Sequence, residues 1–403
     1  MAADRLPPEV LAVLARLEEA GEEGWLVGGC VRDRLLGRPV HDYDIAVSCP
    51  PARTAALFSG HELVLAGAAH GTVGVVAGGR LLELTTFRAD GAYRDRRHPE
   101  QVAFLPDIDG DLARRDFTVN AMAMDRRGRL RDPYGGRKDL EARLLRAVGE
   151  PERRFSEDAL RILRLARFAA KLGFSVEGET LAAALRLRRE TAALSAERIT
   201  AEVAGFVDGE YFSRAAGEML GLFAGVWPAL AEVPSEMLAA FARAEEPDSR
   251  LLLMARAASP GDWPAAVAAF CRRLRLPRSR ERLLDEAARR LALPPSEDPP
   301  EVRRRACRFG DEATRLAFAV DRALGGPRQP EAALYERFCR TGLPRSVREL
   351  AVTGADLLAA GVPEGPAVGT LLARLLEAVI DGQCENTRPA LLDRVRQEET
   401  RYG

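Results

Sequence analysis

Two aspartates separated by one residue, Asp42 and Asp44 in the segment HDYDIAV, have types and spacing that could do chemistry. Side chains alternate along a β-strand, so the two carboxylates would project from the same face, about 6 to 7 Å apart along the chain. Such carboxylates can chelate Mg²⁺, which neutralises phosphate charge in phosphoryl or nucleotidyl transfer. The pattern fits a solvated pair of acids on an edge strand as well. The preceding residues are therefore needed to distinguish a metal site from such a pair.

A glycine pair precedes the aspartates. Residues 25–27 (WLV) predict a short strand, Gly28 and Gly29 a turn, and residues 30–36 a helix that ends at Gly37. The free N–H groups at the start of such a helix can bind an anion. Arg32 in the first turn opposes the helix dipole unless an anion offsets it. A plain tight turn is the alternative, but together with the aspartates the pattern indicates phosphate binding.

A second candidate lies in SEDALRILRLARF, where Ser156 is expected to cap a helix. Helical spacing then places Asp158 and Arg161 at i, i+3 on one face, either as a salt bridge or as a pair that binds a ligand. Arg164 and Arg167 follow at three-residue steps. Each step drifts by about 60° around the helix, so they cannot share one stripe with Asp158.

The elements that must position these residues change in character near residue 140. Short β-rich runs (WLV, YDIAV, TVGVV, LLELTTF, VAFL) dominate from 25 to 125, whereas Ala, Leu, Arg and Glu dominate the rest, broken by Pro and Gly clusters. We therefore expect an α+β domain followed by an all-α remainder. The predicted boundaries lie near residues 140, 205 and 325.

Composition excludes several classes of protein. With 59 Lys and Arg against 60 Asp and Glu, the chain has no uniformly basic coat. Its six cysteines form no C-x-x-C motif, and no run of apolar residues is long enough to span a membrane, so we expect a cytoplasmic protein with no membrane partner. All four histidines lie in the first hundred residues, which excludes a His/Asp phosphohydrolase centre from the C-terminal three quarters.

The segment LVGGCVRDRLLGRPVHDYDIAV closely resembles the signature of the class II tRNA nucleotidyltransferase and bacterial poly(A) polymerase family, within the DNA polymerase β superfamily. The resemblance continues in order through ELTTFRADGAYRDRRHPEQVAF, DLARRDFTVNAMAMD, RFSEDALRILRLARFAAKLGF and LSAERITAEV, and reaches a tail segment similar to that of CCA-adding enzymes. It implies a polymerase β-like nucleotidyltransferase head (1–140), a helical neck that selects the nucleotide (141–205), a helical body (206–325) and a helical tail that binds tRNA (326–403).

The resemblance also implies a role for each candidate residue. Asp42 and Asp44 would hold the metals, and Glu83 would be a third carboxylate that polarises the attacking 3′-hydroxyl. Asp158 and Arg161 would select the base, because cytosine and adenine both present an amine beside a ring-nitrogen acceptor, whereas uracil and guanine reverse that order. The nucleotide itself would be bound by Gly29, Arg32, Arg115, Arg164 and Arg167, with Asp116 and Asn120 near the ribose.

The implied reaction is Mg²⁺-dependent addition of CMP and AMP, from CTP and ATP, to the 3′ end of tRNA without a template. Poly(A) polymerase, an enzyme restricted to CC or to A addition, and a catalytically silent RNA-binding protein are the alternatives. Two stretches with a local charge of +5, 153–189 and 272–290, suit RNA phosphates but also fit solvated helix faces, and no DNA partner is expected. The charged segment 88–102 predicts a surface loop, which in the family is linked to switching from C to A addition. The oligomeric state is left open.

Overall fold

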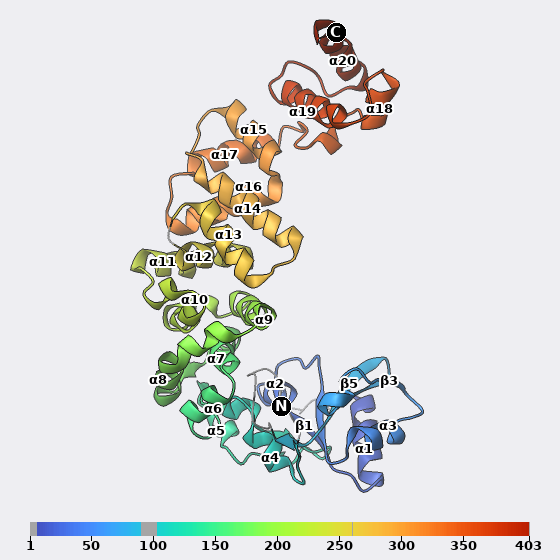
Figure 1. Cartoon of the computed structure of the whole chain (residues 1–403), viewed down its shortest axis with the longest axis vertical. Coiled ribbons are helices and arrows are strands. Elements are labelled where there is room, and N and C mark those ends of the chain that lie inside the picture. The colour runs from blue at the N-terminus through green and yellow to red at the C-terminus, as the bar shows by residue number, and fades with distance from the viewer. Residues whose placement is uncertain (1–5, 90–102, 260, 403) are drawn as a thin grey trace. The chain divides into compact units, whose positions relative to one another are not determined.

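The computed structural model describes residues 6–89, 103–259 and 261–402. The chain divides into two compact units, Met1–Val226 and Trp227–Gly403. The first contains the β-sheet and a group of helices, and the second is helical (Figure 1). The predicted α+β head followed by helices is therefore confirmed.

A mixed sheet of seven strands forms the centre of the head. Its strand order is β3-β4-β5-β2-β1-β8-β9, with β2 and β5 parallel and the other neighbours antiparallel. The strands are β1 (Gly24–Val27), β2 (Asp44–Val47), β3 (Glu62–Val64), β4 (Thr72–Ala77), β5 (Arg80–Thr86), β8 (Ala123–Met124) and β9 (Leu130–Arg131). Two short pairs lie outside it: β6 (Arg88–Ala89) with β7 (Ala103–Phe104), and β10 (Leu144–Leu145) with β11 (Ser175–Val176).

The two faces of the sheet differ. Helices α1 (Pro8–Glu19) and α3 (Pro51–Leu57) pack on one face, over apolar strand residues such as Ile45 and Leu84. On the opposite face, α4 (Ile108–Ala113) packs Ile108 and Leu112 against Ala46 of β2 and Val27 of β1. On that second face β3 and β5 carry exposed side chains, whereas those of β4 between them are half-buried.

The rest of the first unit is helical. It comprises α2 (Gly29–Leu35), which follows β1, then α5 (Gly136–Glu141), α6 (Pro151–Glu157), α7 (Leu160–Leu172), α8 (Gly178–Leu187), α9 (Ala196–Val207) and α10 (Phe212–Met219). Helix α7 packs along α9 and α10 and ends at Gly173, whose φ of 68° suits glycine. The predicted cap at Ser156 is wrong, because Ser156 lies inside α6 and the chain breaks at Asp158 before α7 begins.

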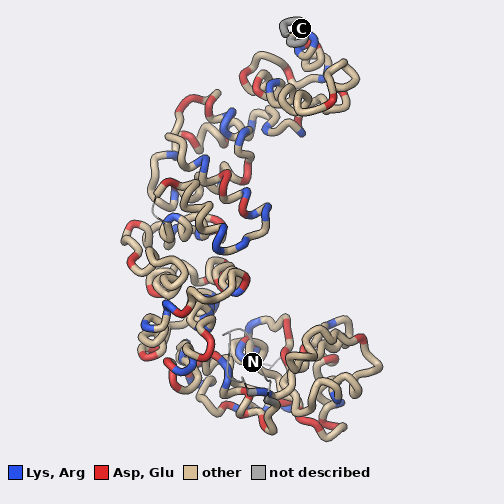
Figure 2. Tube along the Cα trace, in the orientation of Figure 1, with Lys and Arg blue, Asp and Glu red and all other residues tan. Residues whose placement is uncertain are grey.

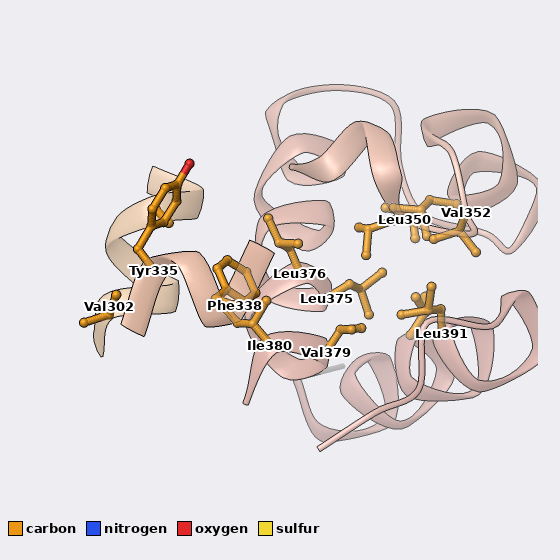
Figure 3. Close-up of a cluster of buried hydrophobic side chains, with 14 of the residues drawn as sticks. Val302, Tyr335, Phe338, Leu350, Val352, Leu375, Leu376, Val379, Ile380 and Leu391 are labelled. Atoms are coloured by element: carbon orange, nitrogen blue, oxygen red, sulfur yellow. The ribbon is translucent and has the colours of Figure 1, made fainter. Parts of the chain in front are cut away.

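The second unit is built of α11 (Ser235–Arg243), α12 (Pro247–Ala258), α13 (Trp263–Leu274), α14 (Arg278–Ala292), α15 (Pro299–Phe309), α16 (Asp311–Leu324), α17 (Gln329–Cys339), α18 (Gly354–Ala359), α19 (Pro366–Ile380) and α20 (Arg388–Tyr402). Figure 3 shows one of its apolar clusters, in which Val302 and Phe338 are joined by Leu375, Val379 and Leu391 from the last helices. The core thus continues across residue 325, and the four-part division of the chain stays a prediction. No helix among the described residues is both long and apolar enough to cross a membrane.

Charged residues of both signs are interspersed along both units (Figure 2). In the basic stretch 272–290, Arg282 pairs with Glu286 and Arg289 with Asp285 on the same helix. Arg290 is 1% exposed and forms an ion pair with Glu331, so the expected phosphate contact is wrong for this residue.

Candidate active site

Asp42 and Asp44 stand at the start of β2. The strand itself begins at Asp44, and Asp42 lies in the segment before it. Both aspartates are exposed, whereas Tyr43 between them is buried under Arg80, whose guanidinium lies 5.5 Å from the ring centre. The alternation predicted from the sequence therefore holds, although only Asp44 belongs to the strand.

Glu83 is brought beside Asp44 by the sheet. The parallel register of β2 and β5 pairs the two residues directly, so both side chains project from the same face. Neighbouring protein atoms partly shield the Asp44 carboxylate from water, and this desolvation raises its pKa. The positive charge of Arg115 lowers the pKa of Asp44, whereas the negative charges of Glu83 and Asp42 raise it further. The three carboxylates thus form one patch of negative charge on the open face of the sheet.

This patch suits a divalent cation through its donor chemistry, since carboxylate oxygens are the ligands that Mg²⁺ prefers. No group of three or more His, Cys, Asp or Glu side chains within the described ranges is close enough to enclose a metal ion. A divalent cation bound by Asp42 and Asp44 would need further oxygen ligands from a phosphate substrate and water.

The glycine turn after β1 makes room for Arg115. Gly28 has φ 72° and ψ −129°, and a Cβ atom there would lie 2.7 Å from Arg115 Nη1. Asp111 holds the same guanidinium by an ion pair of 3.1 Å. Gly29 begins helix α2 directly after the turn. Arg115 is in this way fixed between the glycine turn and the carboxylate patch.

Arg32 is 3% exposed and already paired within the protein. Its Nε and Nη2 donate to the two oxygens of Asp33, both at 2.9 Å, and its Nη1 donates to Asn120 Oδ1 at 2.6 Å. The sequence predicts that a bound anion offsets this cation at the helix start. Within the protein, Asp33, the next residue in the chain, already supplies one negative charge to Arg32.

Asp116 connects this arrangement to helix α7. Its Oδ1 accepts from Asn120 Nδ2 at 3.0 Å and from the Phe117 amide at 2.8 Å, and its Oδ2 accepts from Arg164 Nε at 2.7 Å. Burial alone would raise the pKa of Asp116, but Arg164 and these hydrogen bonds outweigh it and lower the pKa to about 2. Asp116 is therefore ionised at neutral pH and fixes Arg164.

Phe168 lies at the centre of the arginines. Its ring centre is 5.4 Å from the guanidinium carbon of Arg32, 5.2 Å from that of Arg164 and 4.8 Å from that of Arg167. Arg167 also pairs with Glu202 of α9 at 2.8 Å. The structure thus gathers three of the predicted nucleotide-binding arginines around one aromatic ring, a favourable cation–π arrangement.

Asp158 and Arg161 do not form the predicted i, i+3 pair of one helix. Asp158 lies in the break between α6 and α7, where its Oδ1 accepts from the Leu160 amide at 3.0 Å and its Oδ2 accepts from Arg198 Nη2 at 2.7 Å. The local bond to Leu160 competes with helical hydrogen bonding, which explains the break.

Arg161 is 6% exposed and held by several acceptors. It donates to the carbonyls of Arg154 and Arg114, at 2.9 and 2.8 Å, and to Glu157 at 3.0 Å. The bond to the Arg114 carbonyl connects helix α7 to the segment that carries Arg115.

Some residues of this site were not singled out from the sequence: Asp111, Phe168, Arg198 and Glu202. Each acts as the partner of a predicted arginine or aspartate. Arg198 and Glu202 reach theirs from helix α9, whereas Asp111 lies four residues before Arg115 and Phe168 directly follows Arg167. Arg198 lies in LSAERITAEV, a segment that carried the family resemblance, and this was the available signal. Of the predicted loop, residues 90–102 lie outside the described part of the chain.

The chain is similar to known proteins over nearly its whole length. Residues 24–146 match the family model for the poly A polymerase head domain, and residues 261–395 match that for tRNA nucleotidyltransferase domain 2. A CCA-adding enzyme of Geobacillus kaustophilus is 37% identical, with 98% of this chain and 99% of that protein covered. One of Lactobacillus delbrueckii subsp. bulgaricus is 34% identical, with 96% of each covered.

Solved structures show the same similarity. The crystal structure of the Bacillus stearothermophilus CCA-adding enzyme in complex with CTP matches with a TM-score of 0.76 and 33% identity, over 98% of this chain and all of that one. Both the head model and the full-length relatives confirm the resemblance drawn from the sequence motifs. The chain belongs to the CCA-adding enzyme family of tRNA nucleotidyltransferases.

Proposed function

We propose that this protein adds CMP and AMP, from CTP and ATP, to the 3′ end of tRNA without a nucleic-acid template. The observation that carries the proposal is end-to-end similarity to CCA-adding enzymes, one of them crystallised with CTP. The carboxylate patch beside the arginines of α2 and α7 supports it, because nucleotidyl transfer needs anionic metal ligands next to cationic phosphate ligands.

Nucleotidyltransferases of this family generally need a divalent metal ion. We assign Mg²⁺ to Asp42 and Asp44, where it would neutralise charge on the triphosphate during transfer. Glu83 would accept a hydrogen bond from the attacking 3′-hydroxyl and make its oxygen more nucleophilic. The pairing of Glu83 with Asp44 across β2 and β5 supports this role.

The triphosphate and sugar would be bound on the other side of Asp44. Arg115 reaches Asp44 across the glycine turn of Gly28 and Gly29. Three further arginines around Phe168 supply positive charge to the same region: Arg32, Arg164 and Arg167. Arg32 and Arg164 are held in place by Asn120 and Asp116, which limits the side-chain entropy lost when a nucleotide binds.

Base selection is assigned to Asp158 and Arg161. An Asp oxygen can accept from the exocyclic amine of cytosine or adenine, while Arg donates to the adjacent ring nitrogen. Uracil and guanine would leave both side chains without suitable partners. In the structure Asp158 accepts from Arg198 through Oδ2, so a base would share this carboxylate with Arg198.

The proposal keeps the division into a head (1–140), neck (141–205), body (206–325) and tail (326–403), with tRNA bound by the tail. The six unpaired cysteines fit the reducing cytoplasm, where tRNA is processed.

The test is a product-length assay. Purified protein is incubated with tRNA that ends before CCA, with tRNA that ends in CC, and with each of the four NTPs. The proposal predicts two additions from CTP on the first substrate, one addition from ATP on the second, and none from UTP or GTP. Long A tails would indicate poly(A) polymerase instead. Addition of CMP alone or of AMP alone would indicate a CC-only or an A-only enzyme.

A further inference from the structure

An apolar patch lies beside the carboxylates, on the same face of the sheet. Along the register, Asp44 pairs with Glu83, Glu83 with Gly74 of β4, and Gly74 with Val64 of β3. Paired residues project from one face, and neighbouring strands are about 4.8 Å apart. The row therefore passes from the catalytic carboxylates to Val64 in three strand steps, roughly 14 Å.

Gly74 is what makes this patch continuous. A Cβ atom on Gly74 would lie 2.9 Å from Leu81 Cδ1 and 3.0 Å from Val64 Cβ, so these two side chains close over the glycine. They are nevertheless 47% and 43% exposed. Two large apolar side chains that meet on an open sheet face, next to the carboxylates, offer apolar surface that a ligand at this site can cover.

The chemistry of the site determines which ligand reaches this side. In nucleotidyl transfer the attacking and leaving oxygens lie roughly in line on opposite sides of the phosphorus. The arginines lie on the β1 and β8 side of Asp44, because Arg115 contacts the turn after β1 and Asp116 precedes β8. The leaving pyrophosphate therefore belongs to that side, and the attacking hydroxyl must arrive from the side of β5, β4 and β3.

The charges around the patch indicate which part of the RNA it contacts. Glu83 and Glu62 both stand on this face, since Glu62 and Val64 are two residues apart on β3. Their carboxylates repel phosphate but tolerate the uncharged ribose and base. Two aliphatic side chains over a glycine form a surface against which the face of a base can pack.

We propose that Val64 and Leu81 form the platform for the 3′-terminal nucleoside of the RNA that is being extended. This inference rests on the proposed function, because it locates the second substrate of that reaction. The platform positions the attacking hydroxyl near Glu83 and makes no contact with the incoming nucleotide.

The first test is a double variant, Val64→Thr with Leu81→Thr. Threonine has the β-branched shape that suits a strand and exposes less apolar surface than valine or leucine. We expect kcat/KM for tRNA to fall about tenfold, with KM for CTP unchanged. Leu324→Thr, at an exposed leucine of the second unit, is the matched control and should keep wild-type values. Wild-type kcat/KM for tRNA in the double variant would overturn the inference.

The second test locates the RNA directly in the unmodified protein. A tRNA lacking CCA and ending in 4-thiouridine is irradiated with the enzyme, and the adduct is mapped by mass spectrometry. The expected adduct lies in residues 62–65 or 80–83. An adduct elsewhere, in protein that adds CCA normally, would overturn the platform while leaving the proposed function intact. Loss of self-association in the double variant, with normal tRNA kinetics, would instead identify a contact between copies of the chain.

Discussion

Asp116→Asn removes one charge from the centre of the site without creating a cavity. The variant keeps the size of the side chain and retains an oxygen that can accept from the Phe117 amide and from Asn120. Its new NH₂ group, however, would face the guanidinium of Arg164, which now donates to Asp116 Oδ2 at 2.7 Å. Two donors would meet at hydrogen-bond distance, so Arg164 must move away.

The size of the effect follows from the electrostatics of the wild-type carboxylate. A folded-state pKa of about 2 against 3.8 for a free Asp corresponds to a stabilisation of about 2 to 3 kcal/mol at neutral pH. We therefore expect the free energy of unfolding to fall by about 2 to 3 kcal/mol in Asp116→Asn. Because Arg164 also loses its anchor, KM for CTP and for ATP should rise, by about tenfold or more.

The effect has a defined pH dependence. Because the pKa is lower in the folded state, Asp116 stabilises the fold above the unfolded-state pKa near 4 and loses that contribution as the pH falls towards 2. The stability difference between wild type and variant should therefore be full at pH 7 and shrink between pH 4 and pH 2. Urea unfolding at several pH values measures this difference.

Asp125→Asn is the matched control. Asp125 is also a buried acid in an ion pair, with Arg129, but it lies in the turn between β8 and β9. The Asp125→Asn variant should be less stable than the wild type, with no change in KM for CTP. If Asp116→Asn kept the wild-type KM for both nucleotides, or if its stability difference were independent of pH, the assigned role of Asp116 would be refuted.

Three other variants each change one contact of the site or of the second unit. Gly28→Ala forces a side chain into a backbone conformation that favours glycine and against Arg115; KM for CTP should rise and stability should fall by about 1 to 3 kcal/mol, as measured by steady-state kinetics and urea unfolding. Arg198→Ala frees one oxygen of Asp158, and single-turnover assays should show weaker discrimination against UTP, whereas unchanged selectivity would exclude a supporting role. Glu331→Gln leaves three arginines in the second unit without their shared carboxylate. The free energy of unfolding should fall by about 3 to 5 kcal/mol, and a decrease below about 1 kcal/mol would contradict the assigned importance of this buried network.

Much of the head could be predicted from local patterns. The strand at 24–27, the glycine turn and the alternation around Tyr43 depend on neighbouring residues, and periodicity and glycine placement report such features directly. The short strands β3, β8 and β9 were not predicted, since two or three residues carry too little periodicity. The pairing of Glu83 with Asp44 depends on strand order, which no local pattern encodes.

The site was harder to predict where side chains compete for partners. The sequence SEDALRILRLARF reads as one helix, yet the bond from the Leu160 amide to Asp158 and the ion pair with Arg198 favour a break. Likewise, Arg290 belongs by sequence to a basic stretch, but in the structure it is buried and donates a hydrogen bond to Glu331, 41 residues later. In both cases one partner, Arg198 or Glu331, lies 40 or 41 residues away in the chain, so local spacing alone gives the wrong answer.

We propose that Asp42 and Asp44 serve the chemistry of transfer while other residues bind the RNA. The most direct test measures both properties in Asp44→Asn and Asp42→Asn: CMP addition to tRNA lacking CCA in the presence of Mg²⁺, and tRNA affinity by filter binding. We expect each variant to lose transfer and to keep nearly wild-type affinity, because in the proposed mechanism the carboxylates hold the metal and do not contact the tRNA body. Wild-type addition by either variant would contradict the account.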